Sequence, residues 1–363
     1  MVNVGKRKII YIVLIAMALA AAAFCIRIPR VERDTFIAMD TVVSVTLYRG
    51  INASEALFGK ESSLKKIRTD IEDIDRNVAN WRSGDSECAA FNSLDSKEDG
   101  YPAGDEFMDL TKKSIEIAEG TGGYVDPAMG RLIDVWNIED SYGLSGYIPP
   151  EMEAVREAAN ESGYENIYIE DGYIYSHKDI KLDFGAFGKG YALDRIYDIV
   201  SEDKSVKGGV VSVGGSIMAF GSKKGNKDYE IGIRDPEGSV NDILGTLTWG
   251  ETEKVCVSTS GSYERYAESA DGDIYSHILD INTMAPVETE LLSVTIVSPE
   301  GIVSDGLSTA CFVMDREQSE SILRRYSSEG IFVYDDHSVY ITEGLFDHFT
   351  LSSADYYIRN EMK

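Results

Sequence analysis

The stretch LDFGAFGKGYALD, residues 182–194, runs from a predicted strand through a glycine-rich turn into an amphipathic helix. Glycines in such a turn let the backbone approach a ligand, and the start of a helix offers free N–H groups to an anion. The stretch is not a Walker A phosphate loop, because its glycines are too closely spaced and Gly190 stands where a serine or threonine should bind magnesium. Taken alone, it is equally typical of a tight strand-to-helix turn closed by an ion pair between Asp183 and Lys189.

Strand and helix patterns alternate on both sides of this stretch. Apolar residues recur with period two over 43–47 and with helical spacing over 64–78. Asp-Gly pairs at 171–172 and 271–272 are typical of hairpin turns, so antiparallel pairing is expected. Further helices are predicted over 106–119 (stopped by Gly120), after Pro149-Pro150, over 191–200 and over 305–314, and further strands over 209–213 and 293–297. The predicted fold class is α+β, with antiparallel sheets flanked by helices and one lobe folded across a compact core.

Composition excludes several classes of protein. The chain has 363 residues with 43% hydrophobic and 10% aromatic content, enough to bury a core, so disorder is excluded. Its 35 Lys and Arg against 62 Asp and Glu give a net charge of −27, which repels phosphate backbones and disfavours nucleic-acid binding. The four cysteines form no CxxC pair, which argues against a disulfide framework and a zinc-thiolate site.

The first thirty residues are predicted to be a signal-anchor and not part of the fold. Basic residues at 6–8 precede an uncharged run of 18 residues from Ile9 to Ile26, about 27 Å of helix. A lipoprotein attached through Cys25 is the less favoured alternative, because Phe24 stands where a lipobox needs a small residue. We therefore expect residues 1–30 to anchor the chain in the cell membrane, and residues 31–363 to form one domain outside the cytoplasm.

A second unusual segment, Ser304 to Ala310, contains hard oxygen donors. If Ser304 or Asp305 opens a helix, Asp305 and Thr309 lie four residues apart on the same face. A carboxylate and a hydroxyl suit magnesium, with phosphate oxygens completing its octahedron. The alternative is a helix N-cap followed by a buried threonine. Other catalytic templates fail, since the chain has no GxGxxG, GxSxG or HExxH motif.

These segments belong to a longer series of polar and glycine-containing blocks. In chain order the blocks are Met39-Asp40-Thr41; Trp81 to Glu87, leading to Phe91-Asn92; Gly123 to Pro127, with Trp136 after it; Leu182 to Asp194; Gly214 to Ile217; Thr259 to Arg265; His277 to Asp280; and Asp305 to Thr309. Eight blocks in this order resemble the ApbE-type FAD:protein FMN transferases. The resemblance covers essentially the whole chain after the predicted anchor and implies an ApbE-like fold.

The resemblance implies an enzyme that binds FAD and Mg²⁺ and moves the FMN half of FAD onto a Ser or Thr hydroxyl, releasing AMP. It implies FAD contacts at Met39, Trp81, Tyr124, Val125, Asp126, Asp183, Lys189 and Ile278. It also implies a metal site made by the Ala186 carbonyl, Asp305 and Thr309, with His277 as general base. The chain lacks the Asp-Gly-x-Gly-Ala-Thr acceptor motif, so a separate partner flavoprotein is expected.

The residue types fit this chemistry independently of the resemblance. An oxygen-ligated cation neutralises charge on phosphate oxygens, and a histidine titrates near neutrality and can take the proton of an attacking hydroxyl. The alternative for His277 is a packed strand histidine, and Trp81 or Tyr124 could serve the core instead of stacking on a planar ring.

Two blocks depart from the family pattern. Asp40 stands where the family has the glycine of Met-Gly-Thr, and the run Asp280 to Met284 replaces the family's Asp-Pro-x-Thr-Gly turn. Two other functions stay open from the sequence: an FAD pyrophosphatase giving FMN and AMP, and a surface protein that only stores flavin. Lys189, His277, Asp305 and Thr309 together favour chemistry over storage, but transfer and hydrolysis need nearly the same residues.

Overall fold

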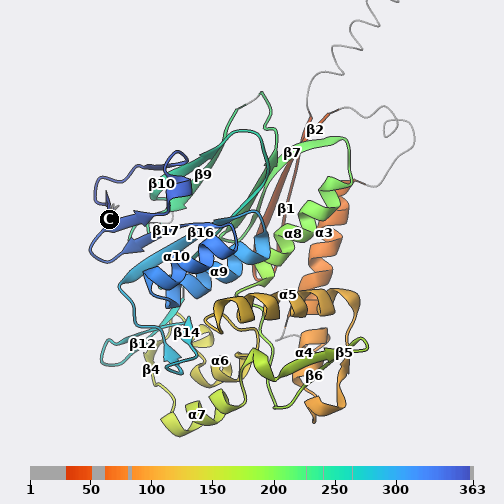
Figure 1. Cartoon of the computed structure of the whole chain (residues 1–363), viewed down its shortest axis with the longest axis vertical. Coiled ribbons are helices and arrows are strands. Elements are labelled where there is room, and N and C mark those ends of the chain that lie inside the picture. Colours follow the sequence, from red (N-terminus) through yellow and green to blue (C-terminus); the bar gives the residue numbers. More distant parts are fainter. Residues whose placement is uncertain are drawn as a thin grey trace, which may run out of the picture.

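The structure, a computed structural model, describes residues 30–50, 62–80, 84–225, 227–239, 241–263 and 265–359. Residues 1–29, and with them the predicted signal-anchor and Cys25, lie outside the described residues, as does Trp81. Within the described ranges, no helix is long and apolar enough to cross a membrane. The described part has the predicted α+β architecture (Figure 1).

A nine-stranded sheet forms the centre of the fold (Figure 1). Its neighbours pair antiparallel, except for β18 and β20, which pair parallel. In spatial order its strands are β1 (Arg30–Ala38), β2 (Thr41–Arg49), β7 (Val206–Val213), β8 (Ser216–Gly221), β11 (Thr252–Gly261), β16 (Leu291–Ser298), β17 (Glu329–Tyr334), β18 (Ser338–Ile341) and β20 (Tyr357–Ile358). The alternation over 43–47 is confirmed, since Val43, Val45 and Leu47 are buried on the inner face of β2.

Helices cover one face of this sheet and build the largest apolar core. Those packed there are α3 (Ser63–Asp73), its π-helical continuation η1 (Ile74–Ala79), α5 (Asp105–Thr121), α8 (Gly188–Ser201), α9 (Gly301–Val313) and α10 (Arg316–Arg325). A three-stranded sheet covers part of the other face and encloses a second core, in the order β19 (Phe349–Leu351), β10 (Ile243–Trp249), β9 (Tyr229–Arg234).

Smaller elements complete the layers and form the predicted lobe. Beside α5 lie α4 (Glu87–Asn92), η2 (Lys97–Asp99), η4 (Tyr164–Asn166) and the sheet of β3 (Tyr101–Pro102), β6 (Tyr173–Ser176) and β5 (Ile167–Glu170). The lobe consists of α6 (Gly130–Trp136), η3 (Glu139–Ser141), α7 (Met152–Asn160), a sheet in the order β13 (Ile274–Ser276), β12 (Tyr266–Ser269), β4 (Ser145–Tyr147), and the pair β14 (Leu279–Asp280) and β15 (Ala285–Pro286). It has its own small core around Leu132 and Val155, and η5 (Glu343–Leu345) lies near the end of the chain.

The hairpin predictions are confirmed, and two helix boundaries are corrected. Asp171-Gly172 and Gly272 turn with positive φ between paired strands. The helix expected to stop at Gly120 continues to Thr121 and ends at Gly122, which has a left-handed φ of 68°. The helix expected from Asp305 begins at Gly301, because the Asp194 carboxylate on α8 accepts the Gly301 and Ile302 N–H groups at 2.8 Å each.

Candidate active site

A cavity of about 370 Å³ lies where the β1–β2 and β7–β8 turns meet the helices α8 and α9 and the lobe. The eleven described residues to which the sequence resemblance assigns a role all line it: Met39, Tyr124, Val125, Asp126, Asp183, Ala186, Lys189, His277, Ile278, Asp305 and Thr309. Residues spread over 39–309 therefore meet at one site.

The turn between β1 and β2 brings Met39 to the cavity. Met39 and Asp40 have φ values of 55° and 54°, which is the left-handed pair of a tight hairpin turn. Asp40 thus adopts the backbone that a glycine would adopt most easily, and aspartate is among the residues that tolerate it. Its side chain is exposed, so the carboxylate is not forced into the interior.

Asp305 is held in the cavity wall by contacts from α8 and β8. Its Oδ2 accepts the Gly190 N–H of α8 at 2.9 Å, and its Oδ1 accepts the Ser216 hydroxyl of β8 at 3.2 Å. The Lys189 ammonium lies 3.6 Å from the same Oδ1. Asp305 is only 4% exposed, yet its carboxylate lines the cavity. The ion pair of Lys189 in this arrangement is therefore with Asp305, a partner that the sequence did not indicate.

A chain of buried hydroxyls connects the Asp305 carboxylate to the sheet. Ser216 is linked to Ser258 on β11 at 3.0 Å, and Ser258 to Ser304 on α9 at 2.9 Å. Ser258 donates to Ser216 and Ser216 donates to Asp305 Oδ1, so these two bonds point toward the carboxylate and polarise each other, whereas the Ser304 hydroxyl donates to the Gly301 carbonyl at 2.8 Å. All three serines are buried, and the hydrogen bonds from Ser258 to Ser216 and from Ser216 to Asp305 fix the orientation of the carboxylate.

Thr309 lies one turn after Asp305 on α9 and also lines the cavity. Its hydroxyl is 3.3 Å from that of Ser260 on β11. In the described part of the chain, no group of three or more His, Cys, Asp or Glu side chains could hold a metal. A magnesium ion bound through one carboxylate, one hydroxyl and a backbone carbonyl is still compatible with these residues, because Mg²⁺ takes its other oxygens from water and substrate phosphates.

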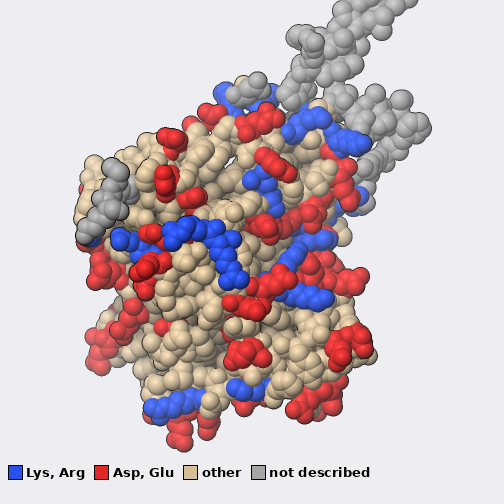
Figure 2. Space-filling model, viewed as in Figure 1, with Lys and Arg blue, Asp and Glu red and all other residues tan. Residues whose placement is uncertain are grey.

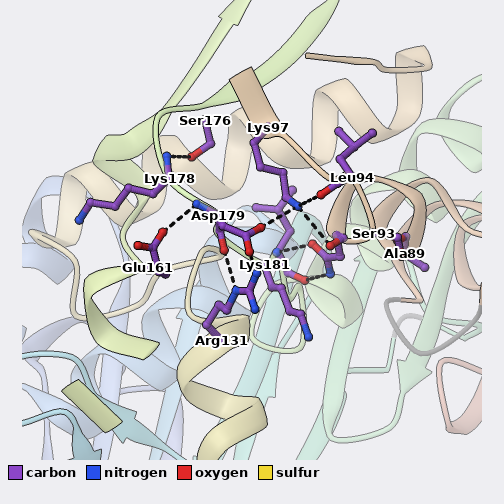
Figure 3. Close-up of polar contacts among 12 residues, drawn as sticks. Ala89, Ser93, Leu94, Lys97, Arg131, Glu161, Ser176, Lys178, Asp179 and Lys181 are labelled. Carbon is purple, nitrogen blue, oxygen red and sulfur yellow. Dashed lines mark hydrogen bonds and ion pairs between the residues drawn. The ribbon is translucent and has the colours of Figure 1, made fainter. Parts of the chain in front are cut away.

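The segment 178–184, which carries Asp183, forms neither helix nor strand and is held by side chains instead. The Asn92 amide accepts the Leu182 N–H at 2.7 Å and donates to the Leu182 carbonyl at 2.9 Å. Earlier in the segment, the Asp179 carboxylate accepts a hydrogen bond from Lys97 Nζ at 3.0 Å (Figure 3). The backbone carbonyl of Asp179 accepts the Arg131 Nε–H at 2.6 Å. These contacts fix the backbone immediately before the cavity.

His277 follows β13 and is held by the backbone. Its Nδ1 lies 2.8 Å from the Arg265 carbonyl, which can only accept, so we assign the ring proton to Nδ1. Burial lowers the pKa of His277 below its usual value, despite the opposing effect of the Arg265 carbonyl. The ring is therefore neutral near pH 7 with a free lone pair on Nε2, as a general base requires.

Tyr124 and Asp126 line the cavity through different interactions. The Tyr124 hydroxyl accepts a hydrogen bond from Gln318 on α10 at 3.1 Å. The Asp126 carboxylate accepts the N–H groups of Ala128 at 2.7 Å and Tyr164 at 2.9 Å. Burial raises the pKa of Asp126 to about 6, against the effect of these two hydrogen bonds. Asp126 therefore lines the cavity and also holds the backbone at Ala128 and Tyr164 in place.

Sequence reasoning missed an ion pair in the cavity wall. The Arg265 guanidinium lies 2.8 Å from the Glu139 carboxylate, and both residues line the cavity. Arg265 ended one of the quoted blocks without a role, and no local pattern marked Glu139. Ser216 also belonged to a quoted block, but its contact with Asp305 depends on a strand pairing that the sequence does not show.

Comparisons with known proteins agree with this geometry. The model of the ApbE family matches residues 39–332. An FAD:protein FMN transferase of Treponema pallidum is 29% identical over 262 residues, which cover 68% of this chain and 70% of that protein. The ApbE protein of Thermotoga maritima has a solved structure that superposes with a TM-score of 0.74 at 27% identity, covering 87% of this chain and 98% of that one. The apo flavinyl transferase ApbE of Pseudomonas stutzeri has the same fold, with a TM-score of 0.75 at 24% identity, covering 90% of this chain and 98% of that one.

Proposed function

Because the chain belongs to the ApbE family, we propose that it transfers the FMN half of FAD to a threonine or serine hydroxyl of an acceptor flavoprotein, with Mg²⁺ bound at the cavity. The enzyme is an FAD:protein FMN transferase, as its matched relatives are. The observation that carries the finer proposal is the meeting of Asp305, Thr309, Lys189 and His277 in one cavity.

The proposed roles follow from the atoms that each residue offers. Asp305, Thr309 and the Ala186 carbonyl would hold Mg²⁺, whose chemistry when bound is to neutralise charge on the phosphate oxygens. The Lys189 ammonium lies beside Asp305, where it can donate to a phosphate oxygen. The buried hydroxyls of Ser258 and Ser216 hold the Asp305 carboxylate in place.

His277 acts on the acceptor in this scheme. Its Nε2 takes the proton of the acceptor hydroxyl as the hydroxyl oxygen bonds to the phosphorus of the FMN half. The bond between that phosphorus and the bridging oxygen of the pyrophosphate breaks, and AMP leaves with the bridging oxygen. The Arg265 carbonyl holds the Nδ1 proton, so the ring presents Nε2 and the imidazolium that forms is stabilised.

Met39, Tyr124 to Asp126, Asp183 and Ile278 are proposed to contact FAD, and Trp81 is proposed to do so from the sequence resemblance alone. The acceptor is proposed to carry an Asp-Gly-x-Gly-Ala-Thr-like motif. We further propose that residues 1–30 anchor the enzyme in the cell membrane and that the domain of residues 31–363 works outside the cytoplasm.

Intact mass spectrometry tests this proposal. The full chain in mild detergent is incubated with FAD, Mg²⁺ and a protein bearing an Asp-Gly-x-Gly-Ala-Thr segment, while AMP is followed in parallel. We expect the acceptor to gain the mass of FMN less one water, and a chelator to abolish the gain. AMP release without labelling of the acceptor would favour a pyrophosphatase, and bound FAD with neither product would favour a flavin store.

A further inference from the structure

Large apolar side chains are exposed on one face of the lobe. Tyr142 is 51% exposed, Leu144 64%, Ile148 85% and Ile274 57%. We call the surface formed by these four residues the lobe face. Several large apolar side chains exposed on neighbouring segments mark a site of contact with another molecule more often than a single exposed residue does.

Strand pairing places part of this surface. Glu268 of β12 pairs with Ile274 of β13 on one side and with Ser145 of β4 on the other, so these three side chains point to the same side of the small sheet, and Leu144 directly precedes Ser145. Tyr142 packs edge-on against Tyr266 of β12, with ring centroids 5.9 Å apart. The opposite side of this small sheet packs on the lobe core, which leaves the lobe face without cover from any described residue.

The strands of the lobe face lead directly to residues of the active-site cavity. Arg265 directly precedes β12 and His277 directly follows β13, and both line the cavity. The sheet of β13, β12 and β4 thus carries the exposed apolar side chains, and His277, the proposed base, follows the end of β13. A protein whose hydroxyl reaches His277 Nε2 must approach this part of the molecule.

We propose that the acceptor flavoprotein docks on the lobe face while its hydroxyl enters the cavity beside His277. The inference rests on the proposed transferase function and names the surface through which that function selects its protein substrate. The exposed apolar side chains anchor the contact, and water is excluded around them, as in other protein interfaces.

Charge indicates the kind of partner that fits. Exposed acidic residues lie within and beside the lobe face: Glu268 between Ile274 and Ser145, and Asp140, Asp271 and Asp273 in the adjoining segments. In Figure 2 the left edge of the molecule near β4 and β12 carries acidic side chains, and a small basic patch lies below them, where Figure 1 places α7. The complementary acceptor surface has apolar side chains near the modified residue and basic side chains around them.

Lysine substitutions test this contact. Leu144→Lys, Ile274→Lys and the double variant are compared with Ile358→Lys, a matched exposed position on β20 at the far end of the large sheet. The readouts are kcat/KM for an acceptor bearing Asp-Gly-x-Gly-Ala-Thr and the FAD affinity measured by flavin fluorescence. We expect each lobe-face variant to lower kcat/KM at least tenfold through the acceptor KM, with FAD affinity within twofold of the wild type.

Three results would overturn the proposal. In the first, the lobe-face variants label the acceptor as well as Ile358→Lys does. In the second, sedimentation shows that the wild type self-associates and that the same variants abolish this, so the face joins two copies of the chain. In the third, the lobe-face variants lose binding to phosphatidylglycerol vesicles but label the acceptor as the wild type does, so the face contacts a membrane. A wild type that never labels the acceptor refutes the proposed function itself, together with the docking that rests on it.

Discussion

The substitution Gly190→Ala should separate the helices α8 and α9 and disturb the Asp305 carboxylate. A Cβ at position 190 would lie 2.1 Å from the Gly301 carbonyl oxygen and 2.7 Å from Asp305 Cβ. Ordinary van der Waals contact begins near 3.4 Å, so the two helix backbones would have to move apart by about 1.3 Å. Neither backbone can rotate out of the way as a side chain would.

The energetic cost can be bounded. Overpacking of a well-packed core costs about 1–3 kcal/mol, and a clash between two backbones belongs at the upper end of that range. Alanine gains up to about 1 kcal/mol over glycine in helix propensity. The net expectation is a loss of about 2 kcal/mol in the free energy of unfolding, measured by urea denaturation.

Gly188→Ala is the matched control for stability. Position 188 lies on the same helix, but its Cβ would meet only Met39 Cε at 3.0 Å, the end of a flexible side chain. We expect its stability to stay within about 0.5 kcal/mol of the wild type. Because Gly190 N–H also binds Asp305 Oδ2, Gly190→Ala should in addition weaken Mg²⁺ binding measured by calorimetry. Equal stability of the two variants would refute the close helix contact.

Four further results are expected. Asp305→Ala should lower Mg²⁺-dependent AMP release by about 100-fold or more, because it removes the charged ligand. His277→Ala should slow transfer by about 10²-fold or more with FAD affinity unchanged. In the pH profile of the wild-type rate, the acid limb should lie below the usual histidine pKa, because burial lowers the pKa of His277. Because the pKa of Asp126 is raised to about 6, the folded state binds its proton more tightly than the unfolded chain, and the free energy of unfolding should fall by about 2–3 kcal/mol as pH rises from 4 to 6. Met284→Gly should stabilise the fold by about 1 kcal/mol, because Met284 has a left-handed φ of 58°.

Each of these has a contradicting outcome. Undiminished AMP release by Asp305→Ala would remove the metal assignment, and loss of FAD binding in His277→Ala would make that histidine structural. Asp126→Asn, which cannot titrate, serves as the control for the pH dependence, and an equal slope in both proteins would exclude Asp126 as its cause. A destabilised Met284→Gly variant would mean that the methionine side chain contributes more than its backbone costs.

Local pattern predicted the elements of the fold better than their arrangement. The period of two over 43–47 and the helical spacing over 64–78 record which side of each element is buried, and the structure has these elements. The order of the nine strands depends on contacts between distant segments, which leave no local period. The start of α9 shows the same limit, because its first N–H groups are capped by Asp194, more than 100 residues earlier.

The candidate site was predictable as a set of residues and not as a network. The blocks around Asp183, His277 and Asp305 stand out because glycine and small polar residues are dense there, and all three reach one cavity. The serines behind Asp305 do not stand out, because Ser258 and Ser304 are ordinary residues of a strand and a helix until pairing brings them within 3.0 Å of their neighbours.

The two departures from the family pattern explain how this cavity is built without the usual glycines. Asp40 and Met284 both take left-handed backbone, with φ of 54° and 58°, where the family pattern has glycine. In the second turn, Asp280 Oδ1 accepts the Asn282 N–H at 2.8 Å, a side-chain turn that substitutes for the missing proline. The Trp136 indole then donates to the Met284 carbonyl at 2.9 Å and ties the turn to the lobe core. Because this turn follows His277 closely, the hydrogen bonds that replace proline and glycine here also hold the loop behind the proposed base.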